Sequence, residues 1–406
     1  MPSALQPMLS FTASDISAFE GSEKKMEINW VPADGSEASS LGWTGGLRTY
    51  GREHWESVVA LLNGTILLHS PEDKMDVYLI SESSLFVYAD RVIILTCGTT
   101  TLLKTLGAIL ESAEKVGLEV SYFQYSRKNF LFPEQQEYPH TSFDQECHYM
   151  SQLFDDGHPY VFGPLTGDHW YVFVADRISR THVDGTPRDG SDRDQTLNIY
   201  MYDIDPVVAQ LFMRADPLII PTILQGGEAS NQEEGGANNN IKKIEGGFDH
   251  SDYGQTFSTT SQEATERSGI AKLIPDGAVV HDHLFEPCGY SMNGRAAGDA
   301  YWTIHITPEA HCSYASFETN YQCDGYADLI RRVVAVFNPS KFTTVEHVDC
   351  ASSAGAIGPQ CPANVDTYRV RGRTLNEFCG KAYSIQMCNY GKMGSGGESE
   401  AEGEAC

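Results

Sequence analysis

Two nucleophilic side chains stand close together in the first quarter of the chain. Ser83 follows Glu82 inside a Ser-Glu-Ser-Ser run at 81–84, and Cys97 precedes a glycine. Serine hydroxyls and cysteine thiols are the protein groups that most often attack carbonyl carbons. A serine that attacks the carbonyl of the preceding residue turns the peptide bond into an ester. A base can then eliminate that ester and so cut the chain.

Ser291 and His305 add a hydroxyl and a base in the second half of the chain. Each of these residues also has a simpler interpretation. Ser291 is typical of a turn serine, His305 of a hydrogen-bonded strand histidine, and Cys97 of a small buried hydrophobic residue. For single residues the simpler interpretation is favoured. The functional interpretation therefore depends on the longer blocks in which these residues stand.

The segments that must position these residues are predicted to be strands. Alternating apolar residues favour strands at 75–81, 85–88 and 91–96 in the first half. In the second half they favour strands at 279–285 and 301–306. Ser83 is therefore expected in a connection between two strands.

Amphipathic helices are predicted at 52–63, 101–116 and 324–337, because apolar residues recur there at helical spacing. Strand-rich segments interrupted by single helices, without βαβ alternation, predict an α+β fold with antiparallel sheets. The two halves share a rhythm of strands followed by one helix, although no sequence repeat is evident.

Composition excludes several function classes. The formal net charge of −27 argues against nucleic acid or an anionic membrane surface as a partner. The sequence has no apolar run long enough to span a membrane, and its start lacks the features of a secretory signal. The ten cysteines include no Cys-x-x-Cys pair, which is typical of reduced thiols. These features predict a cytoplasmic protein.

The domain organisation is predicted to be simple. Residues 1–17 are interpreted as a mobile leader and 18–390 as one domain. Residues 225–267 are rich in Gly, Asn, Glu, Ser and Thr, which predicts a disordered insertion. Residues 391–406 form a tail rich in Gly and Glu.

Several blocks in order resemble one known family. They are Phe19-Glu20-Gly21-Ser22-Glu23-Lys24, the run at 78–87, Thr96-Cys97-Gly98, the run at 125–130, the run at 285–294, and the run at 301–309 that continues to Asn320. The same strings occur in the eukaryotic S-adenosylmethionine decarboxylase proenzymes. The resemblance covers roughly residues 18–385.

The resemblance implies a four-layer α/β/β/α sandwich, in which two antiparallel sheets pack face to face and helices cover the outer faces. It also implies autocatalytic serinolysis of the Glu82–Ser83 bond. The fragments 1–82 and 83–406 would stay folded together. Ser83 would become a pyruvoyl group, the enzyme's only cofactor. Ser291 and His305 match the family's processing residues.

By the same resemblance the substrate is S-adenosyl-L-methionine, decarboxylated for spermidine and spermine biosynthesis. The pyruvoyl carbonyl would form a Schiff base with the substrate amine, and Cys97 matches the proton donor. The remaining matches to the family's active site are Glu20 and Glu23 as active-site carboxylates, Phe19 and Phe285 around the adenine, Glu309 at the ribose, and Glu82 and Ile80 lining the pocket.

Animal members of the family bind the activator putrescine at a buried acidic site. Glu27, Asp194, Thr196 and Glu318 match parts of that site. Two positions depart from the family pattern. Asn198 stands where Glu is usual, and Leu95 stands where a lysine is usual. These departures leave putrescine activation open, and the choice between monomer and homodimer is open as well.

Two other functions remain as alternatives. One is a catalytically dead paralogue that acts as a regulatory partner subunit, although such relatives lack the processing serine. The other is a Cys/His hydrolase built on Cys97. No metal site is predicted, because strand alternation puts His281 and His283 on one face without fixed partners, and the proposed chemistry needs no metal.

Overall fold

The computed structural model describes residues 21, 23–36, 41–42, 44–164, 166–177, 195–214, 257–273, 275, 277–296, 300–323, 325–349, 361–378 and 383–393. The predicted leader, most of the predicted tail, and the site residues Phe19, Glu20 and Asp194 lie outside these residues. The predictions made for them stay predictions.

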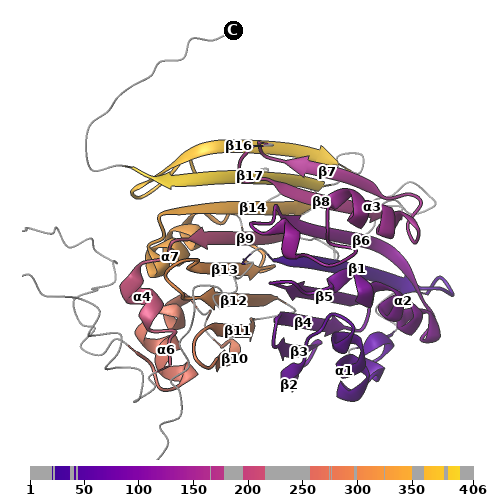
Figure 1. The fold of residues 1–406 in the computed structure, drawn as a ribbon. Helices are drawn as coiled ribbons and strands as arrows, with labels where there is room; N and C mark the ends of the chain where they lie inside the picture. Colours follow the sequence, from indigo (N-terminus) through magenta and orange to yellow (C-terminus); the bar gives the residue numbers. More distant parts are fainter. Residues whose placement is uncertain are drawn as a thin grey trace, which may run out of the picture.

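One antiparallel sheet is formed by the first half of the chain (Figure 1). Its eight strands lie in the order β2 (Ile66–Pro71), β3 (Met75–Ile80), β4 (Ser83–Tyr88), β5 (Arg91–Thr96), β1 (Lys24–Pro32), β6 (Leu118–Lys128), β8 (Trp170–Asp176) and β7 (His158–Phe162). The short turns of the β2–β5 meander make neighbouring strands antiparallel.

A second antiparallel sheet is formed by the second half. Its nine strands lie in the order β10 (Val279–Leu284), β11 (Tyr290–Arg295), β12 (Tyr301–Thr307), β13 (Tyr314–Thr319), β9 (Gln195–Tyr202), β14 (Lys341–Asp349), β17 (Tyr383–Lys392), β16 (Tyr368–Phe378) and β15 (Asn364–Val365). In both sheets a four-strand meander is followed by the first strand of that half. The halves therefore repeat one topology that no sequence repeat revealed.

Helices lie on the outer sides of the two sheets (Figure 1). On the first sheet they are α1 (Arg52–Ala60), α2 (Leu106–Lys115) and α3 (Phe143–Ser151). On the second they are α4 (Pro206–Gln210), α6 (Ser261–Arg267) and α7 (Ala327–Phe337). Short 3₁₀ turns complete the described elements: η2 (Gly46–Thr49), η3 (Leu102–Thr105), η4 (Pro133–Gln135) and η7 (Ile270–Leu273).

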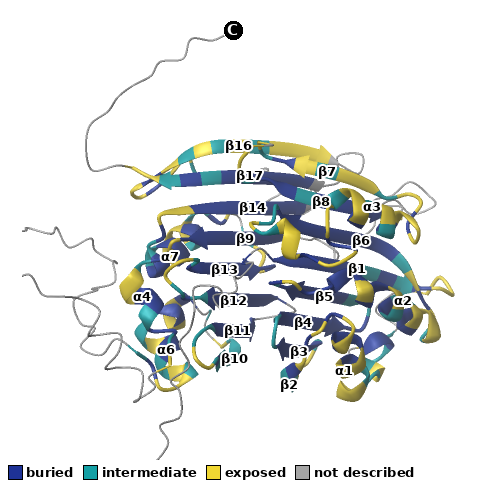
Figure 2. Ribbon diagram, viewed as in Figure 1, coloured by how far each residue is buried: buried dark blue, intermediate teal, exposed yellow. Residues whose placement is uncertain are grey.

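The hydrophobic clusters show that the helices and sheets form four layers. One cluster joins α1, α2 and α3 to the first sheet, and another joins α4, α6 and α7 to the second. Two further clusters lie between the sheets, and one of them brings Phe86 of β4 against Tyr301 of β12. Most strand residues are therefore buried on both faces (Figure 2). The predicted α/β/β/α sandwich is confirmed.

Three local predictions need correction. Residues 261–267 are not part of a disordered insertion but form α6, because Thr260 caps the helix by accepting a hydrogen bond from the Glu263 backbone. Averaging over a polar segment hid this capping signal. The polar strand β11 was not predicted, since its pairing with β10 and β12 is decided by tertiary contacts. Strand β4 begins at Ser83, two residues earlier than expected.

Among the described residues, no helix combines the length and apolar character that crossing a membrane requires.

Candidate active site

Ser83 lies directly after the tight turn between β3 and β4, where Ile80 and Ser83 face each other across the ladder. Along β4, Leu85 and Val87 face the helices, whereas Phe86 faces the space between the sheets. Alternation would send Ser83 toward the helices. Its φ of +142° reverses this direction, so that Ser83 and Ser84 both reach into the space between the sheets.

His305 of β12 approaches Ser83 from the opposite sheet. Its Nε2 lies 2.9 Å from Ser83 Oγ, and its Nδ1 lies 2.8 Å from the hydroxyl of Ser291. Ser291 and His305 are direct partners in the β11–β12 ladder, which fixes this contact. Burial lowers the pKa of His305 to about 3, so the ring is neutral at physiological pH.

Three residues that the sequence did not single out complete this group. Ser84 and Thr303 each donate a hydrogen bond to Asn293 Oδ1, at 2.6 and 2.9 Å. Asn293 Nδ2 donates to the Tyr78 carbonyl, which orients the amide. We call the group Ser83, Ser84, Ser291, Asn293, Thr303 and His305 the serine–histidine network. Strand alternation could have found two of them, since Asn293 lies two residues after Ser291 and Thr303 two before His305.

Cys97 holds the carbonyl of the residue before Ser83. Its backbone N–H donates to the Glu82 carbonyl oxygen at 3.0 Å, and its thiol Sγ lies 3.3 Å from the same oxygen. Burial, followed by the negative charges of Glu82 and Glu23, raises the pKa of the Cys97 thiol. The thiol is therefore protonated, and both Cys97 groups are donors to one carbonyl.

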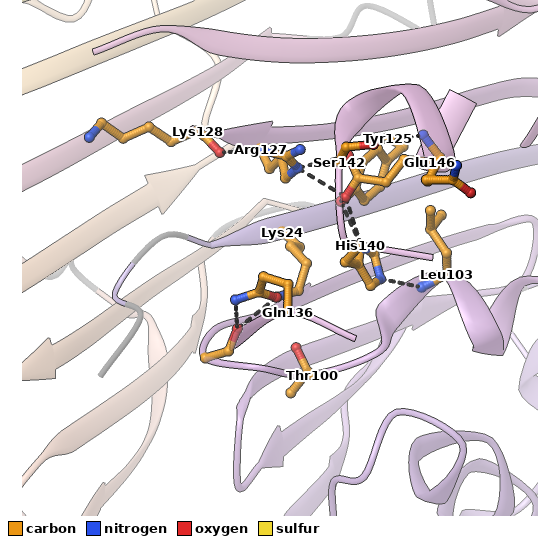
Figure 3. Close-up of polar contacts among 12 residues, drawn as sticks. Lys24, Thr100, Leu103, Tyr125, Arg127, Lys128, Gln136, His140, Ser142 and Glu146 are labelled. Carbon is orange, nitrogen blue, oxygen red and sulfur yellow. Dashed lines mark hydrogen bonds and ion pairs between the residues drawn. The ribbon is translucent and has the colours of Figure 1, made fainter. Parts of the chain in front are cut away.

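The turn after Cys97 is held by buried polar side chains (Figure 3). Lys24 Nζ donates to the Gly98 carbonyl at 2.8 Å and to Gln136 Oε1 at 3.1 Å. Gln136 Nε2 donates to the same Gly98 carbonyl at 3.3 Å. Thr100 Oγ1 donates to the Cys97 carbonyl at 2.9 Å. These bonds restrict the position of Cys97 relative to Glu82.

A second buried group, also drawn in Figure 3, supports the start of η3. His140 Nε2 accepts a hydrogen bond from the Leu103 backbone at 3.2 Å, so the ring proton lies on Nδ1, 2.7 Å from Glu146 Oε1. Burial lowers the pKa of His140 to about 4. Glu146 also pairs with Arg127 at 2.8 Å. This group is rigid and fully partnered, which suits a structural support.

A cavity of about 250 Å³ opens beside the serine–histidine network. The predicted site residues that line it are Glu23, Glu82, Ser83, Cys97, Phe285, Ser291, His305 and Glu309. Ile80 does not line it, because its side chain points to the opposite face of β3 and packs against the helices. The cavity also has Cys288 and Tyr314 in its wall, which the sequence did not indicate.

Glu23 is a buried carboxyl at the edge of this cavity. It accepts a hydrogen bond from Ser316 of β13. Burial raises its pKa to about 8, with the nearby charge of Glu318 acting in the same direction. Glu23 is therefore largely protonated at neutral pH, and its proton lies in the wall of the cavity.

Ion pairs occupy the place predicted for putrescine. Lys25 Nζ lies 2.7 Å from Glu318 and 3.4 Å from Glu27, and Arg91 pairs with Glu27. Asn198 and Tyr301 donate hydrogen bonds to Glu318. We call the group Lys25, Glu27, Arg91, Asn198, Tyr301 and Glu318 the lysine–glutamate cluster. Thr196 lies on the same strand as Asn198, and among the described residues no hydrogen bond joins its side chain to Glu27 or Glu318.

The position of Lys25 explains the departure at Leu95. The two residues are direct partners in the β1–β5 ladder, so their side chains lie on the same face. An ammonium group from β1 therefore occupies the region that a lysine from β5 would reach. Although burial opposes its charge, Glu318 and Glu27 raise the pKa of Lys25 above its ordinary value.

The two histidines considered as metal ligands have other partners. His281 Nε2 lies 3.5 Å from Glu72, and the ring of His283 packs edge-on against Phe285 at 4.7 Å. Within the described part of the chain, no three His, Cys, Asp or Glu side chains are grouped so that they could hold a metal ion.

Comparison with known proteins gives one consistent result. The family model described as adenosylmethionine decarboxylase matches residues 16–391. Two curated relatives are named S-adenosylmethionine decarboxylase proenzyme. The Dictyostelium discoideum protein is 34% identical over 92% of this chain and 86% of its own length. The Xenopus laevis protein is 36% identical over 92% of this chain and 96% of its own length.

The fold is similar to a solved structure, that of the Trypanosoma brucei AdoMetDC-delta26 monomer. The TM-score is 0.51 at 27% sequence identity, and the match covers 77% of this chain and 100% of the solved chain.

Proposed function

Because this chain belongs to the adenosylmethionine decarboxylase family, we propose that it is a proenzyme that cuts its own Glu82–Ser83 bond and then decarboxylates S-adenosylmethionine. The product would be S-adenosylmethioninamine, which supplies the aminopropyl group for polyamine synthesis. One observation carries the proposal. The backbone at Ser83 is reversed so that its hydroxyl meets His305, while Cys97 holds the adjacent carbonyl.

The first step is attack of Ser83 Oγ on the Glu82 carbonyl carbon. The oxyanion that forms would keep the two donors that the carbonyl oxygen already has, the Cys97 N–H and thiol. The positive φ of Ser83 is a strained conformation for a residue with a side chain, worth about 1–3 kcal/mol. Relief of this strain on cleavage would favour the forward reaction.

The second step is removal of the Ser83 α-proton, which eliminates Glu82 as a carboxylate. Neutral His305 is the nearest base, and Ser291 orients its ring. The Ser84 and Thr303 hydroxyls direct their protons to Asn293, so their oxygen lone pairs can accept hydrogen bonds from a proton gained on His305 Nε2. The serine–histidine network thus offers acceptors to a proton held transiently on the ring, although burial keeps the resting ring neutral.

A pyruvoyl group at residue 83 supplies the electrophilic carbonyl that binds the substrate amine and accepts electrons as CO₂ leaves. The residues around position 83 fit that group. The protonated Cys97 thiol lines the cavity, 3.3 Å from the Glu82 carbonyl oxygen, and would deliver the proton to the substrate carbon. Phe285 and Glu309 would contact the adenine and ribose, with Phe19 and Glu20 assigned by the resemblance alone.

The lysine–glutamate cluster argues against putrescine activation of this chain. The carboxylates of Glu27 and Glu318 are already paired with Lys25 and Arg91. Binding a diamine would require one of these cations to leave, which would strand a buried charge. We propose that Lys25 acts as a built-in replacement for the activator.

The two alternatives have less support. A dead paralogue needs no serine at the turn, whereas here Ser83, Ser291 and His305 are in hydrogen-bond contact. A cysteine hydrolase needs a thiolate beside a histidine. The raised pKa of Cys97 keeps the thiol protonated, and its hydrogen bond goes to the Glu82 carbonyl.

The deciding experiment is the intact mass of the denatured protein, with and without borohydride. The expected result is two fragments, 1–82 and 83–406, the larger with a blocked and reducible N-terminus. Ser83→Ala should stay uncut, whereas Ser81→Ala in the same turn should be cut. The Cys97→Ala variant should still be cut and carry a reducible N-terminal group at residue 83. If it then releases no CO₂ from the substrate, the result supports Cys97 as the proton donor. An uncut wild-type chain would refute the proposal.

A further inference from the structure

A second pair of reactive groups lies on the outer face of the nine-stranded sheet, on the side of the helices. Cys361 and Cys388 are both buried free thiols that pack in the helix-facing cluster. The Cys361 Sγ lies 3.2 Å from Thr344 Oγ1. Thr344 and Cys388 are direct partners in the β14–β17 ladder, so their side chains share a face. The sulfur of Cys361 therefore lies over Cys388.

The backbone of Cys361 is fixed by neighbours of Cys388. Its N–H donates to Gln386 Oε1 at 2.8 Å, and Gln386 lies two residues before Cys388 on the same face. Arg373 Nη2 donates to the Cys361 carbonyl at 2.7 Å, and Arg373 is the direct partner of Cys388 in the β16–β17 ladder. Contacts on both neighbouring strands thus hold Cys361 against Cys388.

The two thiols are chemically different. The hydrogen bond from Cys361, together with the guanidinium of Arg373, holds the pKa of the Cys388 thiol below its ordinary value. The Cys361 Sγ also lies 3.5 Å from Glu346 Oε1, which can take up the Cys361 proton once Cys388 has reacted and no longer accepts it. This is the asymmetry that a dithiol needs, with one thiol that ionises more readily and reacts first, and a second thiol that follows.

We propose that Cys361 and Cys388 form an oxidisable dithiol that a hydroperoxide converts to a disulfide. The Cys388 thiolate attacks one peroxide oxygen, takes up a hydroxyl to become a sulfenic acid, and releases the second oxygen as hydroxide. Cys361 then passes its proton toward Glu346, and its sulfur displaces the hydroxyl from Cys388. In total, two thiols and hydrogen peroxide give one disulfide and two water molecules.

Both thiols are buried, whereas Arg373, which donates to the Cys361 carbonyl, is exposed. We therefore expect the peroxide to reach the pair from the side of Arg373. The disulfide would tie the chain before β15 to β17, over the outer face of the sheet. It lies on the face opposite the serine–histidine network. We therefore expect a change in stability rather than in decarboxylation.

The test uses the full-length protein, treated with hydrogen peroxide and then with iodoacetamide before denaturation and digestion without reductant. A linked peptide that joins Cys361 to Cys388 is expected, with a rise in Tm of about 4 °C that a reductant reverses. Arg373→Gln should slow formation of the linked peptide, because it removes the cation beside Cys388.

Matched variants separate the dithiol from general oxidation. Cys361→Ser and Cys388→Ser should each abolish the linked peptide and the rise in Tm. Cys323→Ser, which alters a thiol packed against the same cluster, should leave both unchanged. Recovery of Cys361 and Cys388 as separate unlinked peptides from peroxide-treated wild type would overturn the proposal, and that measurement does not depend on any variant.

Discussion

Two polar groups are buried between the same two sheets, and they handle charge in opposite ways. The serine–histidine network consists of hydroxyls, an amide and a ring whose pKa burial lowers to about 3. In the lysine–glutamate cluster, burial likewise opposes charge, yet Arg91 and Lys25 hold the pKa of Glu27 at about 2. One group stays neutral, and the other stays charged because each ion has a partner.

The lysine–glutamate cluster shares two strands with residues at the cavity wall. Glu318 of the lysine–glutamate cluster lies two residues after Ser316, which donates a hydrogen bond to Glu23 in the cavity wall. Lys25 likewise lies two residues after Glu23, and its charge favours ionisation of that carboxyl, whereas Glu318 disfavours it. Fixed charges therefore act on Glu23, a carboxyl that lines the same cavity as the Glu82–Ser83 bond that we expect to break.

The largest expected effect comes from the serine–histidine network and concerns the rate of self-cleavage. His305→Ala should slow cleavage of the Glu82–Ser83 bond by about 10²–10⁴-fold, because the base is removed. A time course of intact mass after synthesis measures this rate. His347→Ala, on β14 near the lysine–glutamate cluster, is the matched control and should cleave at nearly the wild-type rate. Equal slowing in both variants would mean that His305 is only structural.

On the charged side, Lys25→Met should reduce the free energy of unfolding by about 3–5 kcal/mol, because it leaves Glu318 buried without its cation. Putrescine should restore part of the loss in this variant and have no effect on wild type. Denaturant unfolding of wild type and Lys25→Met, each with and without putrescine, measures the loss of unfolding free energy and its recovery. Lys25→Arg retains the charge and serves as control. If putrescine stimulated the wild-type enzyme, the proposal that Lys25 takes the place of the activator would be wrong.

Glu23 lies between the two groups and should make stability depend on pH. The folded state keeps the Glu23 proton up to about pH 8, whereas the unfolded state loses it near its ordinary pKa of 4.5. Between these values the folded state binds more protons, so stability falls as pH rises. The expected loss between pH 5 and 8 is about 3–4 kcal/mol. In Glu23→Gln, Tm should change less between pH 5 and 8 than in wild type. An equal change in Tm in both proteins would contradict the role of Glu23.

The smallest effect should come from one hydroxyl of the serine–histidine network. Thr303→Val removes the donor to Asn293 Oδ1 and should slow cleavage about fivefold to tenfold. Thr343 of β14, away from the cavity, donates a similar hydrogen bond to Asn389 Oδ1 of β17. Thr343→Val should therefore leave the cleavage rate unchanged. If Thr303→Val slowed cleavage more than His305→Ala does, the central role in cleavage would belong to the Asn293 amide rather than to the His305 ring.

Much of the site was predictable from ordered sequence blocks. Ser83, Cys97, Ser291 and His305 were expected to act together, and the structure brings them to one cavity. Ser84, Asn293 and Thr303 were not expected, although they stand inside the same blocks. Their side chains matter only because two strands of one sheet face a turn of the other, which no local pattern encodes.

The fold class was also readable from the sequence, because antiparallel strands and amphipathic helices are set by periodicity over short windows. The repeat of one strand order in both halves was not readable, since different residues can satisfy the same pattern of burial.

By itself, the sequence determined the α+β class with antiparallel sheets, several of the strands that carry the site, and the residue types that the chemistry requires. The four-layer sandwich was implied by the family resemblance. Only the tertiary structure decided that Ser83 turns away from the face that alternation assigns to it. It also decided that Lys25 lies opposite Leu95 in the β1–β5 ladder, which is why we propose that its ammonium group replaces the lysine missing there. The physical reason is common to both. Backbone reversal and cross-strand pairing depend on which segments meet in space, and such contacts join residues that lie far apart in the chain.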